Sequence, residues 1–144
     1  DTVTAYPSRT SLHGINIDAS QIPDMVPALA LAASAAKGTT EIRHAERLRL
    51  KESDRLMSIT EVLNALGGRV EERPDGLVIT GRDILSGGKA DGYNDHRIVM
   101  MAAIASLITT DKVILTGGAA VNKSYPTFFT VLEENEMGNN LERR

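Results

Sequence analysis

The feature that most limits the fold is the segment HRIVMMAAIASLI, residues 96–108, which is apolar nearly all the way round when drawn as a helix. A helix at a protein surface carries one apolar stripe, whereas a helix that is apolar on most sides has to be covered on most sides. We therefore expect this helix to be buried between sheet layers. The chain can supply the surrounding core, because 42% of its 144 residues are hydrophobic.

Two successive parts of the chain show the same order of predicted elements. The first part, residues 14–81, is predicted to contain a strand at 14–18, a helix at 27–36, a strand at 39–44, a helix at 53–66 and a hairpin at 69–80. The second part, residues 88–144, is predicted to contain a strand from Lys89, a helix at 96–108, a strand at 112–116 and a helix at 126–137. This order predicts an α/β (α+β) fold built from repeated βαβαββ units.

Composition excludes several classes of function. The chain has no cysteine, and therefore no disulfide, thiolate nucleophile or cysteine zinc site. Its three histidines, His13, His44 and His96, follow no metal-ligand spacing. A net charge of −3 and an aromatic content of 3% argue against a nucleic-acid partner, and no apolar run is long enough to cross a membrane. We therefore predict a cytoplasmic protein without a structural metal, whose partner is a small molecule or a protein.

Cations stand at three predicted helix starts, where they are unfavourable. Helix N-termini carry partial positive charge, so Asp or Glu is expected there and Lys or Arg is disfavoured. Lys51 and Arg55 nevertheless flank one helix start, Arg97 lies in the first turn of another, and Lys123 precedes the last. An anion bound between these cations would explain their positions, and phosphate or carboxylate is the natural candidate.

Each of these residues also has a structural explanation when it is taken alone. Lys51 and Arg55 could pair with neighbouring acids, Asp24 could cap the helix that follows it, and a histidine such as His96 could be a hydrogen-bonded packing residue. Together, however, the charged residues fall at equivalent ends of the repeated units, which in α/β folds commonly face a shared crevice. Cations, two carboxylates and a histidine at one place favour an acid/base site for an anionic substrate.

Four motifs point to a known family: Ile-Pro-Asp at 22–24, Lys-Glu-Ser-Asp-Arg-Leu at 51–56, Asp-His-Arg-Ile-Val-Met at 95–100 and Lys-Ser-Tyr-Pro at 123–126. In this order and spacing, over essentially the whole chain, the sequence resembles the C-terminal half of the 5-enolpyruvylshikimate-3-phosphate (EPSP) synthase family, the 3-phosphoshikimate 1-carboxyvinyltransferases. The resemblance implies an incomplete enolpyruvyl transferase-type inverse α/β barrel domain. It also implies transfer of the enolpyruvyl group from phosphoenolpyruvate to the 5-hydroxyl of shikimate 3-phosphate, with release of phosphate and without a cofactor.

The resemblance assigns catalytic roles to three residues. Asp24 would accept a proton near the 5-hydroxyl, and Glu52 would exchange the proton at the phosphoenolpyruvate methylene. His96 would line the site beside the neighbouring arginine. Asp54, in contrast, keeps a structural interpretation as an acid favoured by the dipole of the helix that starts there.

The resemblance also assigns substrate contacts to four cations. Lys51 would contact shikimate 3-phosphate. Arg55, Arg97 and Lys123 would bind the carboxylate and phosphate of phosphoenolpyruvate. One position departs from the family pattern: Arg47 stands where some members place an asparagine that touches shikimate 3-phosphate, so that contact is not expected here.

Members of this family are several times longer than this chain, which begins with Asp rather than Met. We therefore expect residues 1–144 to be the C-terminal part of one domain, with repeats at about 14–81 and 88–144, and the N-terminal domain to lie outside the chain. The chain alone should then be catalytically silent. Two alternatives remain: a fragment of the related UDP-N-acetylglucosamine enolpyruvyl transferase, and a non-catalytic anion-binding module.

Overall fold

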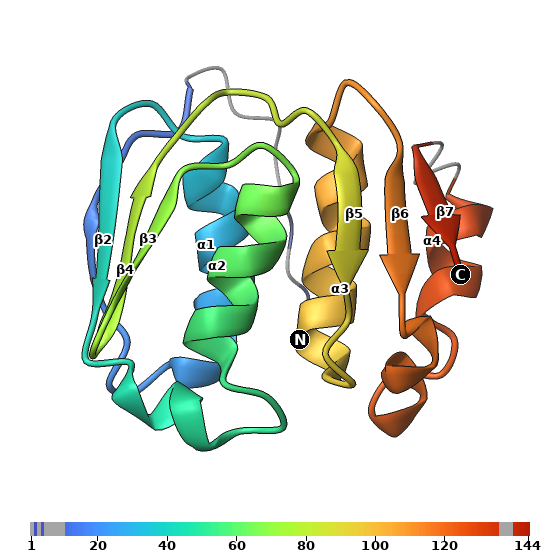
Figure 1. The fold of residues 1–144 in the computed structure, drawn as a ribbon, viewed down its shortest axis with the longest axis horizontal. Coiled ribbons are helices and arrows are strands. Elements are labelled where there is room, and N and C mark those ends of the chain that lie inside the picture. The colour runs from blue at the N-terminus through green and yellow to red at the C-terminus, as the bar shows by residue number, and fades with distance from the viewer. Residues whose placement is uncertain (1, 3, 5–10, 136–139) are drawn as a thin grey trace.

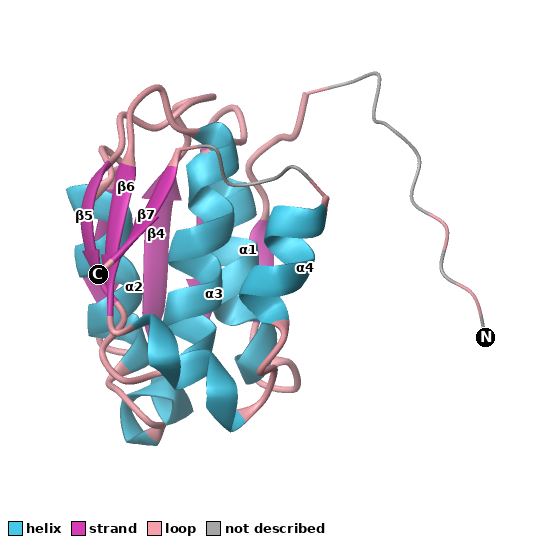
Figure 2. Cartoon of the chain, turned by 90° about the vertical axis from the view of Figure 1, so that its right-hand side faces the viewer, coloured by secondary structure: helices cyan, strands magenta, loops and turns pink. Residues whose placement is uncertain are grey.

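Figure 1 shows the computed structural model of the chain, which describes residues 2, 4, 11–135 and 140–144. In these residues, two small β-sheets pack against three helices, α1, α2 and α3, which lie side by side. In the side view of Figure 2, β5 (Gly88–Asp91), β6 (Val113–Thr116) and β7 (Leu141–Arg143) lie along one side of the molecule, and α4 (Phe128–Glu134) lies on the opposite side.

The first sheet is formed by the part of the chain before residue 81. Its elements follow one another as β1 (Asn16–Asp18), α1 (Val26–Ser34), β2 (Thr39–Arg43), α2 (Arg55–Ala65), β3 (Val70–Arg73) and β4 (Gly76–Thr80). The strand order in the sheet is β1-β2-β4-β3. Strands β1 and β2 are parallel because α1 crosses between them, whereas β4 is antiparallel to both of its neighbours.

The second sheet is parallel throughout and uses the rest of the chain. Its elements are β5 (Gly88–Asp91), α3 (His96–Ala105), β6 (Val113–Thr116), α4 (Phe128–Glu134) and β7 (Leu141–Arg143). Four short 3-10 helices complete the described structure: η1 (Pro23–Met25), η2 (Glu46–Leu50), η3 (Ser106–Ile108) and η4 (Gly118–Lys123).

Strand alternation decides which side chains enter the core of the first sheet. In β2, Thr40 and Ile42 are buried while the residues between and beside them point outward. Gly76 opens β4 one residue before Leu77, which pairs with Ile42, and a Cβ atom on Gly76 would lie 1.8 Å from the carbonyl oxygen of Ile42. Only glycine allows this close approach of the two backbones.

Helix α3 is buried on most of its surface, as its apolar sequence predicts. Ile98, Val99 and Ala102 are fully buried against α2, β6 and η4. Its remaining face is open: Met100 and Ile104 are only half-buried and border a groove along α1. The helix is therefore covered on most sides, as expected, and one face borders the groove.

Element ends differ from the predictions by a few residues, and one strand was not predicted. The predicted helix at 126–137 begins at Phe128, and its last two residues lie outside the described part of the chain. The α-helical part of 96–108 ends at Ala105 and continues as η3. Strand β7 has only three residues and no alternating pattern, so its sequence gives little signal. None of the described helices is both long and apolar enough to cross a membrane.

Candidate active site

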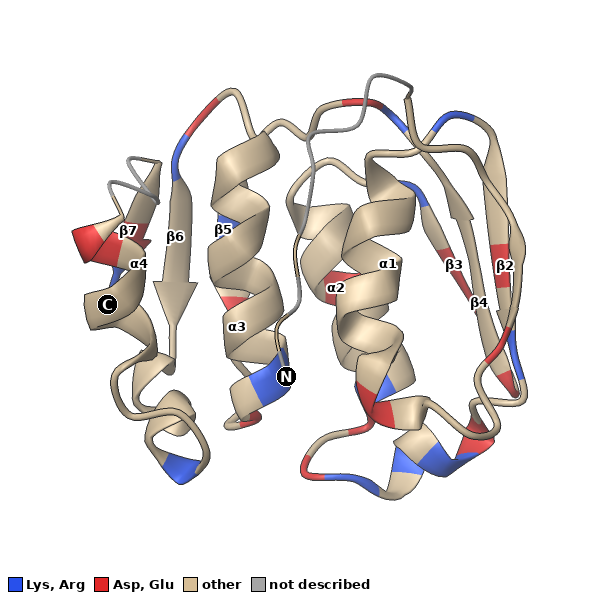
Figure 3. Cartoon of the chain, turned by 180° about the vertical axis from the view of Figure 1, so that it is seen from behind, with Lys and Arg blue, Asp and Glu red and all other residues tan. Residues whose placement is uncertain are grey.

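Helices α1, α2 and α3 all begin at one end of the molecule, and the charged residues predicted to form a site lie there. Figure 3 shows Lys, Arg, Asp and Glu gathered at this end, whereas the bodies of α1 and α3 are uncharged. Asp24 lies in η1 just before α1, Glu52 lies in the loop before α2, and Arg97 lies in the first turn of α3. The contacts between these elements place residues that are up to 73 positions apart in one cluster.

Arg55, the first residue of α2, lies at the centre of the cluster with a side chain that is only 3% exposed. Its Nε atom donates to Oδ2 of Asp95 at 2.7 Å, and Nη2 donates to Oε2 of Glu52 at 2.7 Å and to Oδ1 of Asp95 at 3.2 Å. Its Nη1 atom donates to Oδ1 of Asp24 at 3.0 Å. Burial alone would lower the pKa of Arg55, but the hydrogen bonds and charges of Asp95 and Glu52 outweigh it and raise that pKa.

Asp95 is the most buried acid of the cluster, with a side-chain exposure of 0%. Besides Arg55, it accepts hydrogen bonds from Oγ of Ser53 at 3.1 Å and from the backbone N–H of Arg97 at 3.0 Å, and so caps α3. Burial would raise the pKa of Asp95, but the hydrogen bonds from Arg55 and from the Arg97 backbone lower it. Asp95 is therefore an anion at neutral pH.

Asp24 faces three cations at once. Its carboxylate lies 3.4 Å from Nζ of Lys51, 3.0 Å from Nη1 of Arg55 and 3.3 Å from Nη2 of Arg97, and Arg97 also donates to its backbone oxygen. The side chain is 48% exposed. Burial raises the pKa of Asp24, but the charges of Arg97, Lys51 and Arg55 together lower it. The helix-cap alternative is wrong, because Met25 occupies the N-cap position of α1 and the helix has no side-chain cap.

Glu52 and His96 meet on the same side of Arg55. Oε2 of Glu52, which accepts from Arg55, also lies 3.2 Å from Nδ1 of His96. That contact lacks the direction of a hydrogen bond, so this buried nitrogen has no hydrogen-bond partner among the described residues. The alternative of a hydrogen-bonded packing histidine is therefore wrong for Nδ1. The pair instead places a carboxylate and an imidazole side by side, as proton transfer requires.

Lys123 is the one predicted site residue that contacts none of the other six within the described residues. It ends η4, and its Nζ atom donates to the backbone oxygen of Asn94, in the turn just before α3. Lys123 therefore lies at the edge of the cluster. Arg47 is exposed in η2 and forms no ion pair in the part of the chain that the structure describes.

Asp54 is not directed into the cluster. Its Oδ1 atom accepts from the backbone N–H of Met57 at 3.2 Å, which makes it the N-cap of α2, and Oδ2 pairs with Arg49 at 2.9 Å. An acid at a helix start was predicted here, and its structural role is a specific cap as well as a favourable charge.

Sequence reasoning assigned no role to Asp95 or Ser53. The signal for Asp95 was present, because an Asp directly before an apolar helical run is a good N-cap candidate. Its burial and its contact with Arg55, 40 positions away, carry no sequence signal.

A metal ion does not fit the cluster well. One donor atom from each of Glu52, Asp95 and His96 lies within 4.8 Å of the others, which is a possible ligand set. However, both carboxylates already lie 2.7 Å from the guanidinium of Arg55. A second cation there would be repelled by this buried charge.

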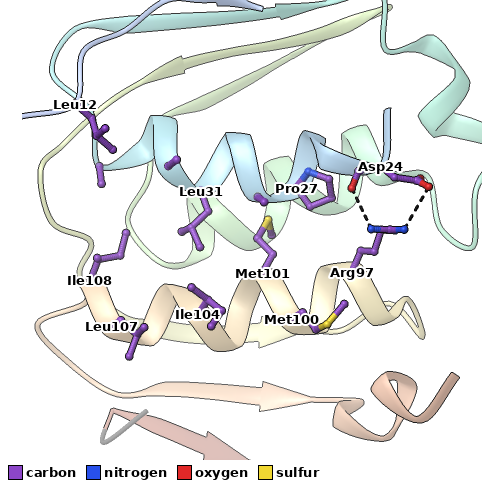
Figure 4. Close-up of a pocket in the computed structure, with 13 residues that line it drawn as sticks. Leu12, Asp24, Pro27, Leu31, Arg97, Met100, Met101, Ile104, Leu107 and Ile108 are labelled. Atoms are coloured by element: carbon purple, nitrogen blue, oxygen red, sulfur yellow. Dashed lines mark hydrogen bonds and ion pairs between the residues drawn. The ribbon is translucent and has the colours of Figure 1, made fainter. Parts of the chain in front are cut away.

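An apolar groove runs from this cluster along the contact between α1 and α3 (Figure 4). Asp24 and Arg97 face each other at one end, and the rest of the groove, of about 450 Å³, is lined almost entirely by apolar side chains. Those labelled in Figure 4 are Leu12, Pro27, Leu31, Met100, Met101, Ile104, Leu107 and Ile108. The cluster therefore combines charges and acid/base groups at one end of a hydrophobic surface.

Comparisons with known proteins identify the family to which the chain is similar. The model of the EPSP synthase (3-phosphoshikimate 1-carboxyvinyltransferase) family matches residues 1–132. The 3-phosphoshikimate 1-carboxyvinyltransferase of Clostridium novyi is 48% identical over 126 residues, which are 88% of this chain and 29% of that relative. The enzyme of the same name from Methanocella arvoryzae is 47% identical over 131 residues, 91% of this chain and 30% of the relative.

A solved structure gives the same result for the fold. EPSP synthase from Acinetobacter baumannii superposes with a TM-score of 0.76 at 31% identity, over 86% of this chain and 30% of that one. This match confirms the mixed α/β fold predicted from the sequence. The chain spans about 30% of the length of these relatives.

Proposed function

Because the chain belongs to the EPSP synthase family, we propose that it forms one wall of a site that moves the enolpyruvyl group from phosphoenolpyruvate to the 5-hydroxyl of shikimate 3-phosphate and releases phosphate. One observation supports this most directly: the carboxylates of Asp24 and Glu52 are held among cations that suit anionic substrates. Such a site offers both acid/base catalysis and stabilisation of the charge that leaves with phosphate.

In this proposal the cations divide between the two substrates. Lys51 contacts shikimate 3-phosphate, while Arg55, Arg97 and Lys123 hold the carboxylate and phosphate of phosphoenolpyruvate. Lys51 and Arg97 are partly exposed and contact Asp24, so a substrate anion competes with the Asp24 carboxylate for them. Arg55 is less available to a substrate anion than Lys51 and Arg97 are, because three protein carboxylates already surround it.

Binding of the substrate anions would also change the basicity of the Asp24 carboxylate. A carboxylate whose pKa is lowered by nearby cations is a weak proton acceptor. When substrate anions draw Arg97 and Lys51 away, that influence weakens and Asp24 becomes a better acceptor for the proton of the 5-hydroxyl. The base then becomes strongest when both substrates are in place.

The second carboxylate, that of Glu52, would exchange the proton at the methylene of phosphoenolpyruvate. Its Oε2 atom lies between Arg55 and His96, so the carboxylate is held in a fixed direction. His96, buried beside it, can take part in moving that proton, since its Nδ1 atom is not engaged by another described group. The two carboxylates thus serve opposite proton transfers in one reaction.

We also propose that residues 1–144 are part of one domain, with repeated units at about 14–81 and 88–144. The groove between α1 and α3 supports this, because it is lined almost entirely by apolar side chains, and exposed apolar grooves commonly mark a contact surface. A third unit of the same domain, outside this chain, would cover it. Exposed Leu12, Met25 and Leu107 at or near the groove fit the same explanation.

The chain alone is then expected to be inactive. Positioning of two substrates and exclusion of water can together account for about 7–11 kcal/mol of an activation barrier, and both need the opposite wall of the cleft. In this proposal an N-terminal domain of the complete protein supplies that wall. We place the complete protein in the cytoplasm, with small-molecule substrates and with neither nucleic acid nor membrane as partner.

The proposal is tested by measuring the phosphate that the complete protein releases from a mixture of shikimate 3-phosphate and phosphoenolpyruvate. Glu52→Gln should lower kcat by about 100-fold or more, because it removes an acid/base group. Arg97→Gln should raise KM for phosphoenolpyruvate more than it lowers kcat. Arg43→Gln is the matched control and should leave both constants unchanged, because Arg43 is an exposed arginine of β2 that pairs with Glu41, outside the cluster.

Two outcomes would overturn the proposal. Enolpyruvyl transfer to UDP-N-acetylglucosamine but not to shikimate 3-phosphate would assign the chain to the related transferase. Phosphoenolpyruvate binding that is unaffected by Arg97→Gln, without any turnover by the complete protein, would favour the non-catalytic anion-binding module.

A further inference from the structure

One carboxylate, that of Asp95, joins three separate parts of the cluster. Its Oδ2 atom accepts from Oγ of Ser53, in the loop that carries Glu52, and from Nε of Arg55 at the start of α2. Its Oδ1 atom accepts from Nη2 of Arg55 and from the backbone N–H of Arg97 at the start of α3. The loop, α2 and α3 are therefore fixed to one another through this single side chain.

Asp95 has no capacity left for a substrate. A carboxylate has about four acceptor directions, and Asp95 uses two hydrogen bonds on each oxygen. It is also fully buried, whereas Asp24 and Glu52 are both partly exposed. Asp95 therefore cannot act as the proton acceptor or donor, and its effect on the reaction has to pass through the residues it holds.

The main residue it holds is Arg55. With Nε and one Nη2 hydrogen fixed on Asp95, the plane of the guanidinium is set, since the group is rigid. Two of the three remaining hydrogens then point to Asp24 and Glu52, the two groups with opposite proton-transfer roles. Rotation of Arg55 would disturb both carboxylates at once.

We propose that Asp95 is a positioning residue, which sets the direction of the Arg55 guanidinium and thereby the placement of Asp24 and Glu52. The inference rests on the proposed function for its effect on the rate, but the Asp95–Arg55 contact can be measured without any activity. It goes beyond a helix cap, because a cap needs only one oxygen of Asp95, whereas holding Arg55 needs both.

Asp95→Asn separates the two roles. Asparagine caps helices as well as aspartate does, so the start of α3 is kept. It offers only one oxygen, however, and its amide group would point N–H donors at Arg55 or Ser53, which are donors themselves. The variant therefore loses the two-oxygen contact with Arg55 while keeping the cap.

The experiment compares Asp95→Asn with Asp54→Asn in the complete protein. Asp54 is a matched control, because it also caps a helix and also pairs with an arginine, but the described contacts of its carboxylate are to Met57 and Arg49 and not to the proposed site residues. We expect Asp95→Asn to lower kcat/KM for phosphoenolpyruvate on the order of 100-fold, as a misplaced catalytic group does, without loss of the circular dichroism signal. Asp54→Asn should leave kcat/KM unchanged.

A second measurement follows Arg55 directly by NMR of arginine side chains. The Nε–H signal of Arg55 should exchange slowly with water in the wild type and in Asp54→Asn, and rapidly in Asp95→Asn. An Arg55 signal in the wild type that exchanges as fast as that of exposed Arg47 would overturn the inference, even if Asp95→Asn fails to fold. Unchanged kcat/KM in a folded Asp95→Asn variant would overturn it as well.

The two measurements also separate this inference from the proposed function. If the complete protein shows no phosphate release, the proposed function fails, and the exchange of the Arg55 signal still decides whether Asp95 holds Arg55.

Discussion

Nε of Arg55 lies 2.7 Å from Oδ2 of Asp95, although the two residues are 40 positions apart, and neither side chain is more than 3% exposed. The pair connects the start of α2, in the unit of the first sheet, with the start of α3, in the unit of the second. Water cannot replace either partner at such a buried position. Asp95 therefore depends on Arg55 for compensation of its charge, whereas Arg55 also pairs with Asp24 and Glu52.

Removal of one partner should be costly. We expect Arg55→Ala to lower the free energy of unfolding by about 3–5 kcal/mol, because it leaves Asp95 buried without its counter-charge. Urea unfolding followed by circular dichroism measures this change. Arg43→Ala breaks an exposed ion pair with Glu41 and should have a much smaller effect, since solvent screens that pair. Equal losses in the two variants would contradict the prediction.

Acid should weaken the fold through the same carboxylates. The pKa values of Asp95 and Asp24 are lowered in the folded protein, where burial is outweighed by the nearby cations. Their ionised forms therefore stabilise the folded state above the unfolded-state pKa of about 3.9, and this contribution is lost as the pH falls through that value toward the folded-state pKa. Urea unfolding at several pH values should show a free energy of unfolding that is constant near neutral pH and decreases at acidic pH.

Asp95→Asn provides the comparison for this acid effect. Asparagine does not titrate, so the variant should be less stable at neutral pH but should lose less stability on acidification. A decline as steep as that of the wild type would show that Asp95 does not contribute to it.

Tyr93 should ionise at unusually high pH. Its hydroxyl donates to Glu61 of α2, and this hydrogen bond, with burial and the charge of Glu61, raises the pKa of Tyr93 to about 12. The contact therefore contributes stability below the unfolded-state pKa of about 10, and that stability is lost as the pH rises toward 12. Ultraviolet titration of tyrosinate should show this late transition, which Tyr93→Phe removes and Glu61→Gln moves to lower pH. A transition unchanged by Glu61→Gln would contradict the assignment.

Two leucines near the start of α2 should differ sharply in importance. Leu56 is fully buried, so Leu56→Ala leaves a cavity and should lower the free energy of unfolding by about 2–5 kcal/mol. Leu50, at the end of η2, is 89% exposed, and Leu50→Ala should change it by less than about 0.5 kcal/mol. Urea midpoints of the two variants measure the difference. A comparable shift for Leu50→Ala would mean that another part of the protein covers this leucine.

Regular elements with a clear period could be predicted from the sequence. Leu56, Ile59 and Leu63 recur at helical spacing, and α2 follows within two residues of the predicted bounds. The hairpin of β3 and β4 was equally clear, because a turn sequence separates two strand-like runs. Strand β7 was not, since three residues carry no period and its pairing with β6 depends on the sheet already being formed.

The sequence predicted that the candidate residues lie together but not which contacts they form. Sequence reasoning placed Asp24, Glu52 and Arg97 at one end of the fold because helix starts are visible in the pattern. Which carboxylate meets which cation depends on how the three helices pack, and packing leaves no local signal. This is why Asp95, whose importance comes from its burial, was not assigned a role.

The contact between Arg55 and Asp95 also bears on how the molecule comes apart. The two sheets are joined in sequence by residues 81–87, so a cut in that stretch would separate Asp95 from Arg55, whereas Arg55 would keep Asp24 and Glu52 in its own half. The second half therefore cannot separate from the first without leaving the buried Asp95 carboxylate without its counter-charge. Amides of β4 and β6 should therefore exchange hydrogen with similar protection, as a single cooperative unit.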